Sequence, residues 1–231
     1  MTPLQCVTLD RSSSRHDIIR SVEAVASPYF DSVAAARQPP PCSPGPTSHQ
    51  IVTDESKVPA DATVSGGNIL SMLAAMGPFR KRGEAILADF GITEIDVERW
   101  YPLRAYVASL RTIGQKMGPN TLLQIGKQIP NHIPLPPGLD TFERVAGSFG
   151  PAFDMNHRGW PPRAITHEMT SDRSVLITTG TPYPCEFDRG VIQGFFQTLL
   201  HTRVTVTHDE AGGCKNEGSR TCTHLVLMPL V

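Results

Sequence analysis

The sequence has no long apolar run and no surplus of charge of either sign. No stretch of its 231 residues approaches the roughly 18 consecutive apolar residues that span a bilayer, so we expect no membrane segment. The formal net charge is −1, and residues of both signs are spread along the chain. Because proteins that bind phosphate backbones usually carry a clustered basic surplus, we also expect no direct contact with nucleic acid.

Motifs of common catalytic centres are missing as well. The chain contains no phosphate-binding loop, no GxGxxG fingerprint, no HExxH pair and no serine in a GxSxG elbow. The N-terminal residues include Asp10, Arg11 and Arg15 and no apolar signal core, which favours a cytoplasmic location. Since no nucleophile with a neighbouring base stands out, a binding role is favoured over an enzymatic one.

Apolar residues make up 39% of the chain, enough to bury one sizeable core. Residues 1–60 are set apart by the proline-rich run 38–46, which cannot sustain a helix or a sheet. We therefore expect a flexible extension over residues 1–60 and a single ligand-binding domain over residues 61–231. Within the domain, a helical part covers 61–159 and a sheet part covers 160–231.

The spacing of apolar residues changes at Gly159. Before it, a 3.6-residue period predicts helices. They are expected over 67–91 with a break at Gly77-Pro78, over 97–117, from 119 onward, and over 141–155 with Asp140 or Thr141 as the cap. After it, strands are expected at 164–170, 175–179, 204–207 and 224–228, with a helix over 184–200. Helices followed by an antiparallel sheet crossed by a helix indicate an α+β fold.

Three of the five cysteines carry information. Cys6 and Cys42 lie in sequence without a regular pattern, and we interpret both as incidental. The other three are Cys185, Cys214 and Cys222. In a reducing compartment, clustered thiols bind metal more often than they form disulfides.

The glycine-rich connection before the last strand can bring these thiols to one ion. Gly218 lies midway between Cys214 and Cys222 and permits a chain reversal there. Three thiolates and one harder ligand would make a closed tetrahedral site, the arrangement typical of structural zinc. The candidates for the fourth ligand lie just upstream: His208, Asp209 and Glu210.

The wider segment adds a pattern. A cysteine precedes a helix with Gly190-x-x-x-Gly194-Phe195, an acidic residue lies five positions before Cys214, and Cys222 follows eight positions later. This pattern resembles the 4-vinyl reductase domain family, which includes the effector-binding modules of phenol- and xylene-responsive transcriptional activators. The part before it, from Gly67 to His157, loosely resembles the helical halves of related nitric-oxide-sensor and vesicle-tethering domains.

The resemblance implies a zinc site and a zinc-stapled C-terminal loop. The implied ligands are Cys185, Asp209, Cys214 and Cys222. An aspartate stands where the family usually has glutamate, and its shorter side chain keeps Glu210 and His208 open as the fourth ligand.

A ligand pocket is expected where the helical part meets the sheet, since such pockets are mostly apolar with a few orienting polar groups. The expected lining residues are Trp100, Tyr106, Phe149, Phe153, His157, Trp160, Ile177, Tyr183 and Phe187. His157 lies at the exit of a predicted helix, where a neutral imidazole can orient a phenol or ketone or bind a haem iron.

These observations favour a regulatory or sensor domain that binds a small hydrophobic or aromatic molecule. Its output would pass through a protein partner or a homodimer, without nucleic acid or membrane. One alternative is an enzyme acting on a ring-bearing substrate, with His157, Tyr183 and Asp154 as its acid-base groups. The other is a haem- or tetrapyrrole-binding protein that uses His157.

Overall fold

The computed structural model describes residues 57–209 and 212–229. All of them belong to Ser48–Val231, the second of two units into which the chain divides. They form an α+β fold, as predicted. The expected extension over residues 1–60 lies almost wholly outside the described residues, as do Cys6, Cys42 and the candidate ligand Glu210.

The first part of the domain is helical, as the apolar periodicity predicted. Its helices are α1 (Gly66–Ala75), α2 (Arg80–Asp89), α3 (Leu103–Met117), α4 (Pro119–Gln128) and α5 (Phe142–Asn156), with short 3-10 turns η2 (Gly77–Phe79) and η3 (Ile129–Asn131). Thr141 caps α5 by accepting a hydrogen bond from the Arg144 backbone. None of the helices within the described ranges is long and apolar enough to cross a membrane.

A small sheet that the sequence did not predict joins the ends of this part. Its strands are β1 (Thr63–Ser65), β2 (Trp100–Pro102) and β3 (His157–Arg158), in the order β2-β1-β3. The helix expected over 97–117 therefore begins only at Leu103, because the residues before it pair with β1. The pairing of Val64 with His157 fixes the backbone of His157 at the exit of α5.

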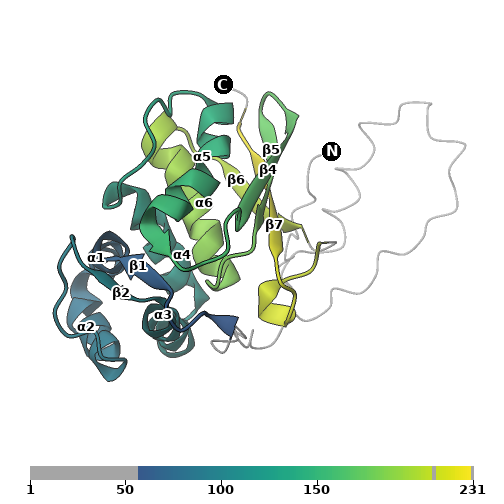
Figure 1. Ribbon diagram of the computed structural model, residues 1–231. Helices are drawn as coiled ribbons and strands as arrows, with labels where there is room; N and C mark the ends of the chain where they lie inside the picture. The colour runs from purple at the N-terminus through teal and green to yellow at the C-terminus, as the bar shows by residue number, and fades with distance from the viewer. Residues whose placement is uncertain (1–56, 210–211, 230–231) are drawn as a thin grey trace, which may run out of the picture. The chain divides into compact units, whose positions relative to one another are not determined.

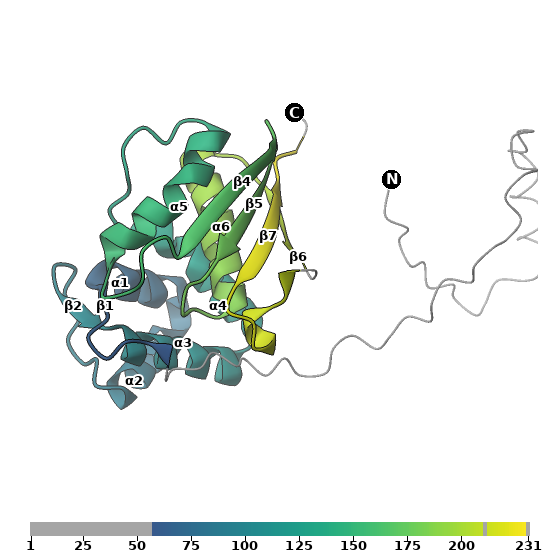
Figure 2. The ribbon, with the colours of Figure 1, turned by 45° about the vertical axis from the view of Figure 1, so that its right-hand side comes forward.

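The second part is a four-stranded antiparallel sheet crossed by a long helix (Figures 1 and 2). The strands are β4 (Ile165–Ser171), β5 (Ser174–Thr179), β6 (Thr205–Asp209) and β7 (Cys222–Leu227), in the order β4-β5-β7-β6. Helix α6 (Cys185–Leu200) lies with α5 against one face of this sheet. Apolar side chains from both helices and from the inner face of β5 and β7 form a core there.

Helix α6 also packs closely on α4, which ties the two parts together. A Cβ on Gly190 would lie 2.3 Å from the carbonyl oxygen of Leu123, and a Cβ on Gly126 would lie 2.3 Å from that of Phe187. Only glycine at both positions permits this backbone contact. Phe187 and the neighbouring Tyr183 consequently reach into the core of the helical part.

Candidate functional site

A cavity of about 40 Å³, partly open to the surface, lies where α5, α6 and η3 meet. Since a water molecule takes about 30 Å³ in the liquid, the cavity has room for about one. Its lining is largely apolar and comes from both parts of the fold: Asn68, Ile129, Ile133, Phe149, Ala152, Phe153, Asn156, His157, Ile165, Thr181, Tyr183, Phe187, Asp188, Val191 and Phe195. The cavity is thus at the expected junction, and it is small.

Five of the residues expected to line a pocket line this cavity: Phe149, Phe153, His157, Tyr183 and Phe187. Four lie elsewhere. Trp100 lies in β2, where the Arg158 guanidinium sits 3.8 Å from its ring centre. Tyr106 is fully buried, donates to the Asn68 carbonyl and packs edge-on against Tyr183.

Trp160 packs against the core of the helical part, and Ile177 belongs to the core between the sheet and α5. Asp154, named with His157 and Tyr183 for an enzymatic role, is exposed and does not line the cavity. The acid-base set proposed for an enzyme therefore does not assemble around this cavity.

Two polar side chains of the lining, His157 and Tyr183, are hydrogen-bonded to each other. His157 Nδ1 lies 2.8 Å from the carbonyl oxygen of Phe153, and His157 Nε2 lies 2.5 Å from the Tyr183 hydroxyl. A carbonyl oxygen only accepts hydrogen bonds, so Nδ1 must carry the proton. Nε2 is then bare, and the Tyr183 hydroxyl donates to it.

Burial keeps both groups neutral. Desolvation lowers the pKa of His157 to about 4, although the hydrogen bond to Phe153 opposes the shift. Desolvation also raises the pKa of Tyr183 well above its usual value. The Phe153 ring stacks on the imidazole with centroids 3.8 Å apart. The cavity therefore presents an uncharged donor-acceptor pair framed by aromatic rings.

The depressed pKa of His157 predicts a pH dependence of stability. The unfolded chain protonates this histidine near pH 6.5, while the folded protein resists protonation until about pH 4. The stabilisation is therefore complete above pH 6.5 and is lost as the pH falls toward 4. We expect His157 alone to lower the free energy of unfolding by about 2 kcal/mol between pH 7 and pH 5.

Urea unfolding of the wild type and of His157→Gln at pH 7, 6 and 5 measures this contribution. The wild type should lose about 2 kcal/mol more than the variant over that range. Parallel pH profiles for the two proteins would contradict the burial of a neutral imidazole.

A second site lies at the end of the sheet next to α6. One ligand atom from each of Cys185, His208, Cys214 and Cys222 lies within 4.8 Å of the others. The sulfurs of Cys214 and Cys222 are 3.8 Å apart. In a tetrahedral zinc site with bonds of about 2.3 Å, two sulfurs are separated by about 3.8 Å. The donor set and spacing fit a closed zinc centre of three thiolates and one imidazole.

The fourth member of this cluster is His208 and not Asp209, the residue that the family resemblance implied. Successive side chains of a strand point to opposite faces. His208 pairs with His224 on the inner face, whereas Asp209 pairs with Thr223, whose hydroxyl bonds to Thr178 on the other face. The alternative that the sequence left open, His208, is thus the residue brought to the thiols.

Hydrogen bonds within the cluster favour the thiolate form of Cys222. A hydrogen bond from the Cys185 thiol lowers the pKa of Cys222 to about 5, and hydrogen bonds from the Lys215 backbone and from His208 act in the same direction. The Lys215 N–H lies 3.1 Å from the Cys222 sulfur. The pKa of Cys185 is raised in turn, because its proton is held between the two sulfurs. A thiolate is the form that binds a metal ion.

A buried ion pair connects this centre to the cavity. Lys215 is next to Cys214, and its ammonium group contacts the carboxylate of Asp188 and the hydroxyl and carbonyl oxygens of Thr181. Asp188 and Thr181 both line the cavity. Both members of the ion pair are 5% exposed. Sequence reasoning missed this pair, because nothing in the pattern marks Lys215 as buried.

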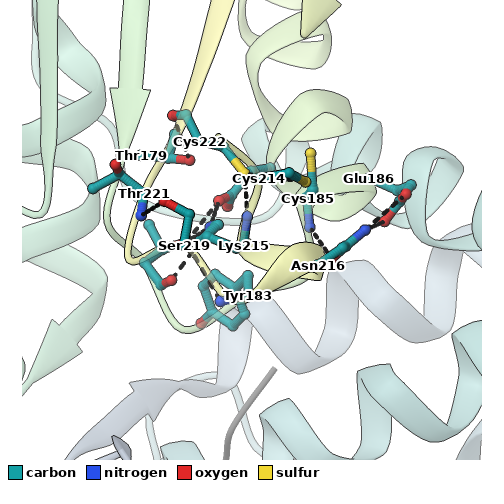
Figure 3. Close-up of polar contacts among 12 residues, drawn as sticks. Thr179, Tyr183, Cys185, Glu186, Cys214, Lys215, Asn216, Ser219, Thr221 and Cys222 are labelled. Atoms are coloured by element: carbon teal, nitrogen blue, oxygen red, sulfur yellow. Dashed lines mark hydrogen bonds and ion pairs between the residues drawn. The ribbon is translucent and has the colours of Figure 1, made fainter. Parts of the chain in front are cut away.

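Asn216, next to Lys215, contacts the first turn of α6. Its side-chain oxygen accepts from the Cys185 backbone N–H, and its amide group donates to the Glu186 carboxylate (Figure 3). The turn η5 (Lys215–Glu217) therefore contacts the first turn of α6, the thiol cluster and the cavity wall at once. The loop at Cys214 and the cavity wall are therefore linked by side chains in direct contact.

Comparison with known proteins identifies the fold. No protein-family model matches the chain, and no curated protein matches it by sequence. Among solved structures, an H-NOX protein from S. oneidensis in the Fe(II)NO ligation state matches with a TM-score of 0.52 at 14% identity, covering 71% of this chain and 99% of that one. An unliganded Fe(II) H-NOX mutant from K. algicida matches with a TM-score of 0.54 at 10% identity, covering 72% and 97%.

A mutant H-NOX from T. tengcongensis matches with a TM-score of 0.51 at 10% identity, covering 72% of this chain and 98% of its own. By their descriptions, the first of these structures holds Fe(II) with NO bound and the second holds unliganded Fe(II). At these identities the likeness establishes a shared fold and nothing about function. Membership in the 4-vinyl reductase family is not shown and stays a prediction.

Proposed function

We propose that this protein is a sensor domain that binds a small uncharged ring molecule carrying one hydroxyl group, next to a structural zinc centre. One observation carries the proposal. Tyr183 is itself a phenol, and its hydroxyl donates to the bare Nε2 of the buried, neutral His157 inside an aromatic cavity. The cavity therefore already makes, with a side chain of its own, the contact that a phenolic ligand would make.

The size of the cavity sets the condition for binding. A cavity of about 40 Å³ is smaller than a single ring, so the Tyr183 ring must turn away from His157 to admit one. The hydroxyl of the ligand then replaces the Tyr183 hydroxyl on Nε2, so His157 keeps a partner, and the displaced Tyr183 hydroxyl must find water or another acceptor. The movement of Tyr183, which packs on Phe187 of α6, is a route by which occupancy changes the position of α6.

The haem alternative is favoured by the fold, because the matched H-NOX structures are iron proteins by their own descriptions. The residues around the cavity do not fit a haem. His157 is a potential iron ligand, because its Nδ1–H donates to the Phe153 carbonyl as the second nitrogen of a metal-bound histidine usually does, but its Nε2 is taken by the Tyr183 hydroxyl. The lining residues include no lysine or arginine to pair with propionates, and a macrocycle exceeds the space many times over. We therefore assign no role here to haem.

The zinc centre has a structural role in this proposal. Three cysteines and His208 would fill the four tetrahedral positions of the ion and keep none open for a substrate. The ion would hold β6, β7 and the first turn of α6 together, and its binding free energy would add to that of folding. The signal would then pass to a protein partner or to a second copy of the chain, as the sequence already suggested.

Phenol and toluene test the recognition of the hydroxyl, because the two molecules differ little in size. We expect the zinc-loaded protein to bind phenol about tenfold more tightly than toluene, which corresponds to one buried hydrogen bond of about 1.4 kcal/mol. In His157→Phe the preference should disappear. Titration calorimetry or ligand-observed NMR measures both affinities.

Phe149→Leu is the matched control, since it changes an apolar part of the same lining. This substitution should weaken both ligands by a similar factor and preserve the ratio. Equal affinity of the wild type for phenol and toluene, or no binding of either, would contradict the proposed recognition.

A further inference from the structure

His224 is a fully buried histidine whose two ring nitrogens both lack a partner among the described residues. It lies on the inner face of β7, between Cys222 and Val226 in the row of buried residues. An unpaired buried polar group is costly, so a polar side chain kept in this state calls for a physical reason.

Its neighbour supplies that reason. His208 is the direct cross-strand partner of His224, and their rings meet edge to face with centroids 5.3 Å apart. The Nε2 atom of His208 is also buried and, within residues 57–209 and 212–229, has no partner. Because His208 makes a hydrogen bond to the Cys222 sulfur and Nε2 makes none, Nδ1 is the nitrogen that faces the thiols.

Binding of a metal ion to one nitrogen of His208 determines that the other nitrogen carries the proton. A neutral imidazole that binds a metal through Nδ1 carries its proton on Nε2. Histidines that bind metals almost always donate this second N–H to an acceptor, which sets the orientation of the ring. The side chain in ring contact with His208 is His224, whose neutral ring has one bare nitrogen able to accept.

We infer that His224 is a positioning residue of the metal centre, which accepts the Nε2–H of metal-bound His208. This hydrogen bond would give a partner to His208 Nε2 and to one of the two unpartnered nitrogens of His224. This inference rests on the proposed metal centre, and it adds a residue that does not touch the ion.

The test compares His224→Leu with His224→Gln in the full chain. Competition with a zinc chelator should show that the leucine variant binds zinc about 10–100-fold more weakly than the wild type. Glutamine keeps an acceptor oxygen and should recover most of that loss. With cobalt in place of zinc, the leucine variant should keep the thiolate absorption bands, since all three cysteines remain, and shift the ligand-field bands.

If His224 had a purely structural role, His224→Leu would lower the melting temperature of the metal-free protein. The positioning role predicts no such loss. In chelated protein, leucine removes an unsatisfied polar group at similar volume, so the melting temperature should stay level or rise by a few degrees. Ile177→Val, at the cross-strand partner on β5, is the matched packing control. It should lower the melting temperature and keep the zinc affinity of the wild type.

Two results separate the possible failures. A wild-type protein that takes up no zinc would overturn the metal centre, and this inference with it. A wild type that binds zinc while His224→Leu binds it equally tightly would overturn the inference alone.

Discussion

Replacing Lys215 with methionine is expected to lower the free energy of unfolding by about 3–5 kcal/mol. The Lys215 ammonium group is paired with Asp188 in the interior, where both side chains are 5% exposed. Methionine keeps the length of the side chain and the backbone N–H that donates to Cys222, so the thiol cluster keeps that contact. Within residues 57–209 and 212–229, what remains to the Asp188 carboxylate is a hydrogen bond from the Thr181 hydroxyl. An uncompensated buried charge is what makes the change severe.

Thermal unfolding should show a melting temperature lower by about 6–20 °C, at about 2–4 °C for each kcal/mol in a domain of this size. Lys81→Met, at an exposed position of α2, is the control and should change stability by less than about 0.5 kcal/mol. The double variant Lys215→Met with Asp188→Leu removes both charges and should recover much of the loss. A Lys215→Met protein as stable as the wild type would show that the ion pair is not buried.

Replacing Cys222 with serine should produce the other large effect. Its side chain is fully buried, and hydrogen bonds from Cys185, Lys215 and His208 lower the pKa of its thiol, which favours the metal-binding thiolate form. A serine hydroxyl is not a thiolate ligand, so the variant should lose the ion. With free zinc at about a thousand times its dissociation constant, bound zinc adds about 4 kcal/mol to stability. The expected fall in melting temperature is therefore about 8–16 °C.

Chelation provides the matched comparison in the same experiment. A strong chelator should lower the melting temperature of the wild type by a similar amount and leave the Cys222→Ser variant unchanged. If the chelator lowers the stability of both proteins equally, the ion acts elsewhere. If it changes neither, the four residues do not hold a metal.

The longer elements of the fold followed from the sequence, and the shortest did not. A helix such as α5 shows several turns of apolar period and a capping threonine, so both its position and its start were predictable. Strands β1, β2 and β3 have only two or three residues, too few to show alternation. Their pairing depends on contacts between distant segments, which also explains why Trp100 was assigned to a helix.

The metal centre shows where pattern reasoning reaches its limit. The three cysteines were identified from their spacing, but the choice between His208 and Asp209 depends on strand register. A shift of one residue moves every side chain of a strand to the opposite face. The five residues of β6, next to a glycine-rich connection, carry too little apolar alternation to fix that register. The structure fixes it through pairing with β7.

The pocket was predictable in part for a related reason. Helical spacing identifies residues that face inward, which holds for Phe149, Phe153 and Tyr106 alike. Whether an inward residue borders a cavity or fills a core depends on the gap between helices, which the sequence does not encode locally. Polar residues of the lining such as Asn68 and Asp188 carry no periodic signal, and their role emerged only from the packing of α6.

Native mass spectrometry of the full chain, purified without added metal from cells that supply both zinc and haem, tests the central claim most directly. Our account predicts a mass equal to the chain plus one zinc ion, with no haem, and loss of the zinc in Cys222→Ser. A chain that carries one haem, which His157→Gln abolishes, would contradict it and move function to His157 as an iron ligand.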